Sequence, residues 1–181
     1  MRQKLDYLQS AFSRALDLGA GAFHDARTSV RLLESLGESL GCDWGTLWKV
    51  DGVRHQLSPI ATWSAPTRDA PLLERDTLNR SLSVSEGNAG HVWRSRKPIW
   101  TTELIKDMCI PRSIDAVAAG LRGGIWFAVK TEGAVYGIVE LLGPDVPKPT
   151  EELLAGIEIL GIRLGEAIED AAKTPPNSVL S

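Results

Sequence analysis

A glycine-bounded stretch at residues 120–143 constrains the fold of this 181-residue chain more than any other segment. Two runs rich in β-branched and aromatic residues, 125–131 and 135–142, flank a short connection in which Gly133 is free to adopt a positive φ. This pattern predicts a β-hairpin. Because both runs are apolar on both of their alternating faces, we expect the hairpin to lie in the middle of a sheet that is covered on both sides.

The segments at either end of the chain supply helices and a first hairpin. Apolar residues at spacings of three and four predict helices at residues 2–22, 25–40 and 150–173, and Gly41 ends the second of them as a C-cap. Alternating apolar residues predict that the first hairpin has strands at 44–50 and 55–63.

An irregular insert of short elements separates the two hairpins. Its expected elements are a helix at 72–80, a helix at 91–96 entered through the glycines of 87–90, a brief strand at 99–102, and a helix at 113–119 with Ser113 as N-cap. Loops and short helices cover a sheet less tightly than long helices do, so we expect a pocket beneath this insert.

The order of these elements predicts an α+β fold, with a central antiparallel sheet, the terminal helices on one face and the insert on the other. We expect three parts along the chain. They are an N-terminal signalling or dimerisation helix at 1–24, a domain that includes the C-terminal helix at 25–173, and a disordered tail or linker at 174–181.

Composition excludes several function classes. The net charge is −3 and the Lys and Arg residues are scattered, so no basic surface for nucleic acid or anionic lipid is expected. No apolar run approaches the roughly 20 residues that cross a bilayer, so we expect neither membrane nor nucleic acid as a partner and place the chain in the cytoplasm. Cys42 and Cys109 have no Cys or His close to them in sequence, which predicts neither a disulfide framework nor a metal site.

Ordered motifs across residues 41–168 resemble those of a GAF domain, of the subtype found as sensor modules in bacterial histidine kinases and diguanylate cyclases. The motifs are Trp44-Gly45, Leu47-Trp48-Lys49-Val50-Asp51, Ala61-Thr62-Trp63, Gly90, Val92-Trp93, Lys97-Pro98-Ile99-Trp100, Pro111-Arg112, Ala119-Gly120-Leu121-Arg122, Phe127 and Val135-Tyr136-Gly137-Ile138-Val139-Glu140. The resemblance implies about six strands, a ligand pocket under the insert, and terminal helices that relay a signal, commonly through a parallel dimer. The chain departs from the subtype at Asn88-Ala89 and at Phe127-Ala128, where a proline usually follows the aromatic residue.

The resemblance directs particular side chains into the pocket. It places Trp63, Trp93 and Trp100 there, although such rings also fill a core beneath an insert. Arg112 is suited to hold a carboxylate or a phosphate bidentately, and its alternative is a solvated or capping arginine. Glu140 lies in an otherwise apolar strand, and because an unpaired buried carboxylate is costly, we expect it to pair with a polar ligand or with Arg112.

Met108 and Cys109 lie in the same insert and complete the expected ligand-binding set. A reactive Cys109 would resemble the free methionine sulfoxide reductases that share the GAF fold, but those enzymes rely on several cysteines at the pocket. An inert thiol is therefore the preferred interpretation. His91 as a haem ligand is set against the simpler interpretation of a surface histidine.

The last helix has a second apolar stripe opposite the one that faces the sheet. Ala155, Ile159 and Ile162 form this stripe, and it needs a partner, either the first helix or the same helix of a second subunit. Together with Leu8 and Phe12 of the first helix, these residues form the expected interface of a homodimer.

The sequence thus predicts a non-catalytic sensory or regulatory module that binds an unidentified small molecule and relays a signal in a two-component or cyclase system, with a kinase or cyclase output domain in the same or another chain. Two alternatives remain, a ligand-free dimerisation scaffold whose tryptophans fill the pocket and a small redox enzyme that uses Cys109. No spacing of nucleophile, base and orienting residue indicates a catalytic triad. The residue constellations of cyclic-nucleotide and bilin binding are absent from the sequence, and no cofactor is identified.

Overall fold

The chain is organised around an antiparallel sheet. The structure is a computed structural model, and it describes residues 2–106 and 112–173. The strands of the described residues form a six-stranded sheet in the order β3-β2-β1-β6-β5-β4, and each neighbouring pair is antiparallel. They are β1 (Trp44–Asp51), β2 (Gln56–Ser64), β3 (Leu82–Ser83), β4 (Ile99–Thr101), β5 (Gly123–Lys130) and β6 (Val135–Gly143). The predicted α+β fold is confirmed, and the hairpin β5–β6 lies inside the sheet as expected.

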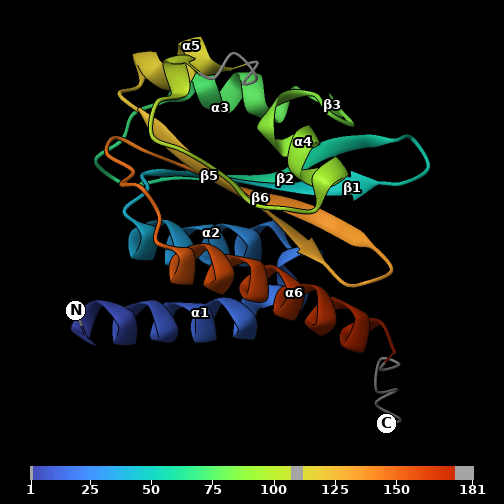
Figure 1. Cartoon of the computed structure of the whole chain (residues 1–181). Coiled ribbons are helices and arrows are strands. Elements are labelled where there is room, and N and C mark those ends of the chain that lie inside the picture. The colour runs from blue at the N-terminus through green and yellow to red at the C-terminus, as the bar shows by residue number, and fades with distance from the viewer. Residues whose placement is uncertain (1, 107–111, 174–181) are drawn as a thin grey trace, which may run out of the picture.

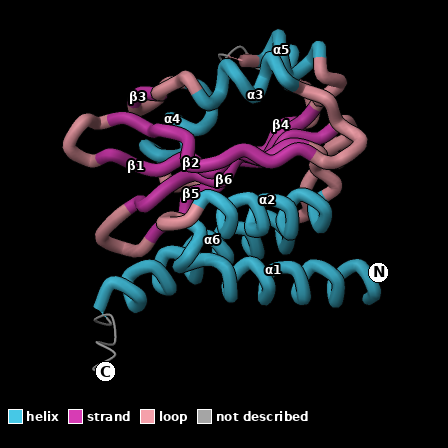
Figure 2. The backbone as a smooth tube through the Cα atoms, turned by 180° about the vertical axis from the view of Figure 1, so that it is seen from behind, coloured by secondary structure: helices cyan, strands magenta, loops and turns pink. Residues whose placement is uncertain are grey.

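Three long helices cover one face of this sheet. α2 (Ala26–Leu40) and α6 (Glu151–Lys173) lie against the strands, and α1 (Arg2–Ala22) crosses both as an outer layer (Figure 1). Figure 2 shows the same layers from behind. Apolar side chains such as Leu36 of α2 and Leu164 of α6 are buried between the layers. The part boundaries predicted near residues 24 and 173 remain a prediction, and residues 174–181 lie outside the described residues.

The ends of α2 follow from its sequence. Asp25 is the N-cap, and its carboxylate accepts hydrogen bonds from the Thr28 amide at 2.8 Å and the Thr28 hydroxyl at 2.6 Å. These bonds, the one from the hydroxyl first, hold the pKa of Asp25 below its ordinary value. Gly41 ends the helix with a φ of 70°, and its amide donates to the carbonyl of Gly37.

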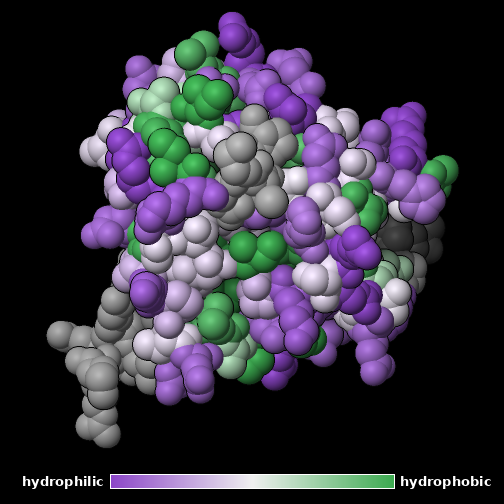
Figure 3. Space-filling view, turned by 45° about the horizontal axis from the view of Figure 1, so that its top comes forward, coloured by the Kyte–Doolittle hydropathy of each residue, from purple (hydrophilic) through white to green (hydrophobic). Residues whose placement is uncertain are grey.

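The insert covers the opposite face. It contains α3 (Pro71–Leu78), α4 (Gly87–Ser95), a short 3₁₀ turn (Leu104–Lys106) and α5 (Ser113–Ala118), which lie above the sheet in Figure 1. Figure 3 shows its outer surface, where apolar residues appear at several places between charged ones. The largest side chains that are fully buried on this face of the sheet are Trp44, Trp48 and Trp126.

α4 begins four residues earlier than predicted, because the glycines that seemed to lead into the helix belong to it. Gly87 is its first residue and has a φ of 60°. A Cβ on Gly90 would collide with the backbone of Ser83 and Ser85. The glycine at 90 is therefore a helix residue that allows close approach to β3, a two-residue strand that was not predicted from the sequence.

One local prediction about a helix end was wrong. Ser113 is the first residue of α5 rather than its N-cap, a position that Arg112 occupies without a capping side-chain bond. In the second hairpin, Gly133 does not use its freedom to adopt a positive φ. The amide of Thr131 donates to the carbonyl of Ala134 at 2.9 Å, and a connection of this length turns the chain without a left-handed residue at 133.

α6 lies unusually close to the sheet. A Cβ on Gly161 would collide with the carbonyl oxygen of Ala128, and a Cβ on Gly165 would collide with the carbonyl oxygen of Lys130. Both obstacles are backbone atoms of β5, so side-chain rearrangement cannot relieve the collision. These two glycines allow α6 to rest directly on the strand.

Candidate functional site

A buried polar cluster lies between the insert and the sheet. Glu140 of β6 is directly opposite Thr46 of β1 on one side and Trp126 of β5 on the other. All three side chains point toward the insert. Trp44 and Trp48 point the same way, because they lie two residues before and after Thr46 on β1. The sheet thus presents one carboxylate within a surround of indole rings.

Arg112 brings the opposite charge from the insert. Its guanidinium donates to the two carboxylate oxygens of Glu140 at 2.6 and 2.8 Å, and the side chains of the pair are only 2% and 3% exposed. A second guanidinium nitrogen donates to the Thr77 hydroxyl of α3 at 2.6 Å. The guanidinium also lies 5.2 Å from the ring centroid of Trp48, within the range of a cation–π contact.

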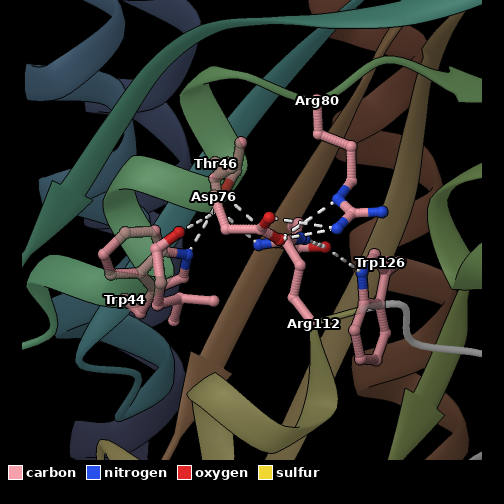
Figure 4. Close-up of polar contacts among 9 residues, drawn as sticks. Trp44, Thr46, Asp76, Arg80, Arg112 and Trp126 are labelled. Carbon is pink, nitrogen blue, oxygen red and sulfur yellow. Dashed lines mark hydrogen bonds and ion pairs between the residues drawn. The ribbon is translucent and has the colours of Figure 1, made fainter.

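Further donors complete the surroundings of Glu140. The Thr46 hydroxyl donates to it at 3.1 Å and the Trp126 indole N–H at 2.8 Å, while the Trp44 indole N–H donates to Thr46 at 3.1 Å. Figure 4 shows Arg112 reaching this group from α5, with Trp44 and Thr46 on one side and Trp126 on the other. A buried carboxylate that accepts four hydrogen bonds, two of them from a cation, is well compensated for its loss of hydration.

Two donors of the cluster have no acceptor. They are the Nε atom of Arg112 and the indole Nε1 atom of Trp48, both buried. Buried donors are rarely left without a partner, so these two nitrogens are the positions in the cluster where an additional acceptor atom would be favourable.

Arg112 and Glu140 are brought together as the sequence suggested, but two of the expected pocket residues lie elsewhere. Trp63 is paired with Gly45 and packs on Gly37 of α2, in the core on the helical face. Trp100 also lies against that core, and its indole donates to the carbonyl of Pro147 at 2.8 Å. Their predicted place beneath the insert was wrong.

The remaining predicted ligand-binding residues have mixed outcomes. Trp93 is half-buried at the margin of the insert-side core. Met108 and Cys109 lie outside the described residues. Cluster members that sequence reasoning did not select are Trp44, Thr46, Trp48, Thr77 and Trp126. For Thr46 and Trp48 a signal was present, since their alternation along β1 puts them on one face.

Two hollows of the surface lie away from this cluster. One of about 420 Å³ is lined by Arg96 of the insert and by residues of the β5–β6 turn and α6, and one of about 550 Å³ is lined by residues of α1 and α2. Beneath the insert, three buried indoles and the Arg112–Glu140 pair occupy the space where a pocket was expected. The chain's own side chains therefore fill the space beneath the insert.

Other candidate chemistries find little support in the residues described. Burial raises the pKa of the Cys42 thiol to about 12, which makes it a poor nucleophile. Residues 2–106 and 112–173 contain no group of three or more His, Cys, Asp or Glu side chains arranged to hold a metal ion. Across the same ranges, no helix is both long and apolar enough to cross a membrane.

The expected dimer residues are only partly available to a partner. Ile159 and Ile162 are 57% and 36% exposed. Ala155 is exposed, whereas Phe12 is half-buried and lies beside Gly156 of the same chain. Leu8 lies in α1, but its side chain is outside the part that the structure describes. Whether this surface forms a dimer remains a prediction.

The fold and the cluster define an α+β domain in which an insert is closed over the sheet by a buried ion pair. The chain belongs to the GAF domain family, whose model matches residues 26–169. GAF domains are a family of sensory and regulatory modules. No curated relative matches the sequence.

Solved structures agree with this assignment. The chain is similar to the GAF domain of a phosphoenolpyruvate-protein phosphotransferase from Coxiella burnetii, with 19% identity, a TM-score of 0.66 and coverage of 93% of this chain and 94% of that chain. The corresponding GAF domain from Acinetobacter has 13% identity, a TM-score of 0.66 and coverage of 94% and 95%. The free methionine-R-sulfoxide reductase from Neisseria meningitidis, solved in complex with its substrate, has 13% identity, a TM-score of 0.63 and coverage of 90% of each chain. At these identities the likeness establishes the fold.

Proposed function

We propose that this GAF domain is a sensory module of bacterial signal transduction that binds a small molecule under the insert and does not catalyse a reaction. The observation that supports the proposal is the Arg112–Glu140 pair, an ionic bond that joins the insert to the sheet and is almost completely buried. A contact of this kind gives the insert a defined closed state. A ligand that binds better to an open arrangement of the insert shifts the population from the closed state to the open one.

The chemistry of the cluster suggests how a ligand enters. The Arg112 Nη2 atom donates to both carboxylate oxygens of Glu140 in the closed state, so a ligand with a carboxylate or phosphate group can take the place of Glu140 on the same guanidinium. Opening exposes the Trp48 indole and the Arg112 Nε atom, which have no acceptor in the closed state. Trp93, at the margin of this core, is then positioned to cover the ligand.

Ligand screening tests this proposal. Freshly purified protein is examined by native mass spectrometry and by thermal shift with a panel of small carboxylates and phosphates. A ligand at 100 times its Kd stabilises the protein by about 2.7 kcal/mol, which for a chain of this size raises Tm by about 5 to 11 °C.

Matched variants decide where the ligand binds. Arg112→Lys keeps the positive charge but loses the guanidinium, whose separate nitrogens bond Glu140 and Thr77 at the same time, so the shift should fall strongly. Arg80→Lys changes an arginine just beyond the end of α3, whose partner is Asp76 of that helix at 2.9 Å, in a pair whose side chains are 32% and 33% exposed, and it should leave the shift unchanged. If no compound shifts the wild type, or if the two variants respond alike, small-molecule binding at Arg112 is refuted.

A ligand-free dimerisation scaffold is the second candidate, and the buried indoles of Trp44, Trp48 and Trp126 favour it because they fill the space beneath the insert. Light scattering of the double variant Ile159→Glu with Ile162→Glu tests the dimer. We expect the mass to halve. The control Ile105→Glu changes a more exposed residue of the insert, and an unchanged mass in the double variant would remove α6 from the interface.

The wider setting belongs to the same proposal. We expect the protein in the cytoplasm, as a module of a two-component or cyclase system, with α1 and α6 leading to a kinase or cyclase output domain in the same or another chain. The long, exposed ridges of these helices suit such a role.

A further inference from the structure

One edge of the sheet connects the insert to α6. β4 pairs with β5 only from Gly124 to Trp126, so within the described residues the last part of β5 has no strand paired on that side. A side chain at this open edge is able to reach elements on both faces of the sheet. The residue at the end of β5 is Lys130, a residue type well suited to an edge.

Lys130 contacts both layers. Its ammonium group donates to the carbonyl oxygen of Arg96 at 2.5 Å and to the carboxylate of Glu158 at 3.0 Å. Arg96 is the C-cap of α4 in the insert, where a cation interacts favourably with the helix dipole. Glu158 belongs to α6. The Lys130 side chain is only 12% exposed and that of Glu158 is 44% exposed, so the ammonium end of this bridge is shielded from solvent more than in an ordinary surface pair.

The β5–β6 turn is tied in the same two directions. The Arg96 guanidinium donates to the carbonyl of Glu132 at 2.8 Å, which joins the turn to the insert. The hydroxyls of Thr131 and Tyr136 donate to Glu169 of α6 at 2.7 and 2.6 Å. The strand pairing shifts between Val129 and Lys130, which leaves Tyr136 as an extra residue that can turn toward α6.

The contact between β5 and α6 leaves little room for independent motion. Gly165 rests on the carbonyl of Lys130, so a displacement of this end of β5 meets the helix backbone directly. A change in the insert therefore has a short, continuous path to α6, through the end of α4, the Lys130 side chain and the glycine contact.

We propose that Lys130 transmits the open or closed state of the insert to α6, as a positioning residue that couples α4 to Glu158. This inference rests on the proposed sensory function and specifies its regulation. It is tested without any ligand, so that its failure is distinct from the failure of ligand binding.

Hydrogen exchange measured by mass spectrometry supplies the test. Glu140→Gln removes the charge that holds Arg112 and so loosens the insert. We expect faster exchange in peptides of α4 and, through Lys130, a roughly two- to tenfold increase in peptides that contain Glu158. In the double variant Glu140→Gln with Lys130→Met, the increase in α4 should persist and the increase in α6, measured against Lys130→Met alone, should disappear.

Two controls keep the result interpretable. Lys173→Met removes a lysine whose ion pairs within residues 2–106 and 112–173 are with Glu169 and Asp170 of α6, and should leave the response intact. If Glu140→Gln loosens the whole protein, seen as faster exchange in α2, Arg112→Lys replaces it as a milder change. An α6 response that is the same with and without Lys130, or no α6 response when the insert loosens, overturns the proposal.

Discussion

The Arg112–Glu140 pair gives a sharp energetic prediction. Arg112→Met leaves the Glu140 carboxylate buried with two neutral donors, Thr46 and Trp126, and should cost about 3–5 kcal/mol. Glu140→Leu leaves the guanidinium buried with Thr77 and should cost a similar amount. The double variant has no buried charge and loses three hydrogen bonds to neutral partners, at about 1 kcal/mol each.

The double variant should therefore be about as stable as either single variant. Independent effects would sum to about 6–10 kcal/mol, whereas the structure predicts about 3 kcal/mol, so the interaction energy is about 3–7 kcal/mol. Urea denaturation at pH 7 measures the free energies of unfolding, and each single variant should lower Tm by about 6 to 20 °C.

The control and the refuting result are equally defined. Arg80→Met breaks a half-exposed pair with Asp76 and should cost no more than about 1 kcal/mol. If a single variant does not fold, Arg112→Lys replaces Arg112→Met as a milder substitution in this comparison of single and double variants. Additive losses in the double variant would show that the two residues do not act as a buried pair, and the closed insert would lose its physical basis.

Three further predictions concern other parts of the molecule. Gly165→Ala should destabilise the protein by about 1–3 kcal/mol because its methyl group meets the backbone of β5, whereas Gly156→Ala, with its nearest contact at 3.5 Å, should be neutral or stabilising; thermal unfolding compares them. In a variant whose other cysteine is serine, Cys42 should resist a thiol reagent at about pH 8 until the protein is unfolded, and prompt labelling of the native state would contradict its raised pKa. Hydrogen bonds from the Tyr136 hydroxyl and, to a lesser extent, the Thr131 hydroxyl hold the pKa of Glu169 below its ordinary 4.5. The stability that these bonds contribute is present above that pH and is lost as the pH falls through the lowered value. Tyr136→Phe should therefore flatten the decline in stability between about pH 5 and pH 3, and an unchanged slope would refute the argument.

Most of the fold could be predicted because its signals are local. Spacings of three and four identified α1, α2 and α6, alternation identified the first hairpin, and two continuous apolar runs around a short connection identified the second. The short strand β3 and the first turn of α4 were missed for one shared reason. Gly90 usually indicates a loop, but here it allows α4 to lie against the backbone of Ser83, and such a contact exists only in the folded chain.

The site was predicted only in part, because the sequence does not show which face of the sheet the insert covers. Glu140 could be found because a carboxylate in an apolar strand needs a partner, and Arg112 is the buried cation that the insert supplies. Alternation tells which residues of a strand share a face but does not tell which face the insert covers. Trp63 and Trp100 were therefore assigned to the insert face, although they lie on the helical face of the sheet. Thr77 left no sequence signal, because its role depends on where α3 lies above the sheet.

The outer layer of the fold determines how the terminal helices can move. Gly19 of α1 lies over Leu164 of α6, and Phe12 lies beside Gly156, so α1 holds α6 at two places along its length. Because the two helices are in contact at both places, α6 cannot tilt without displacing α1. We therefore expect the two helices to move together, so that a displacement of the carboxyl-terminal helix is shared with the amino-terminal one.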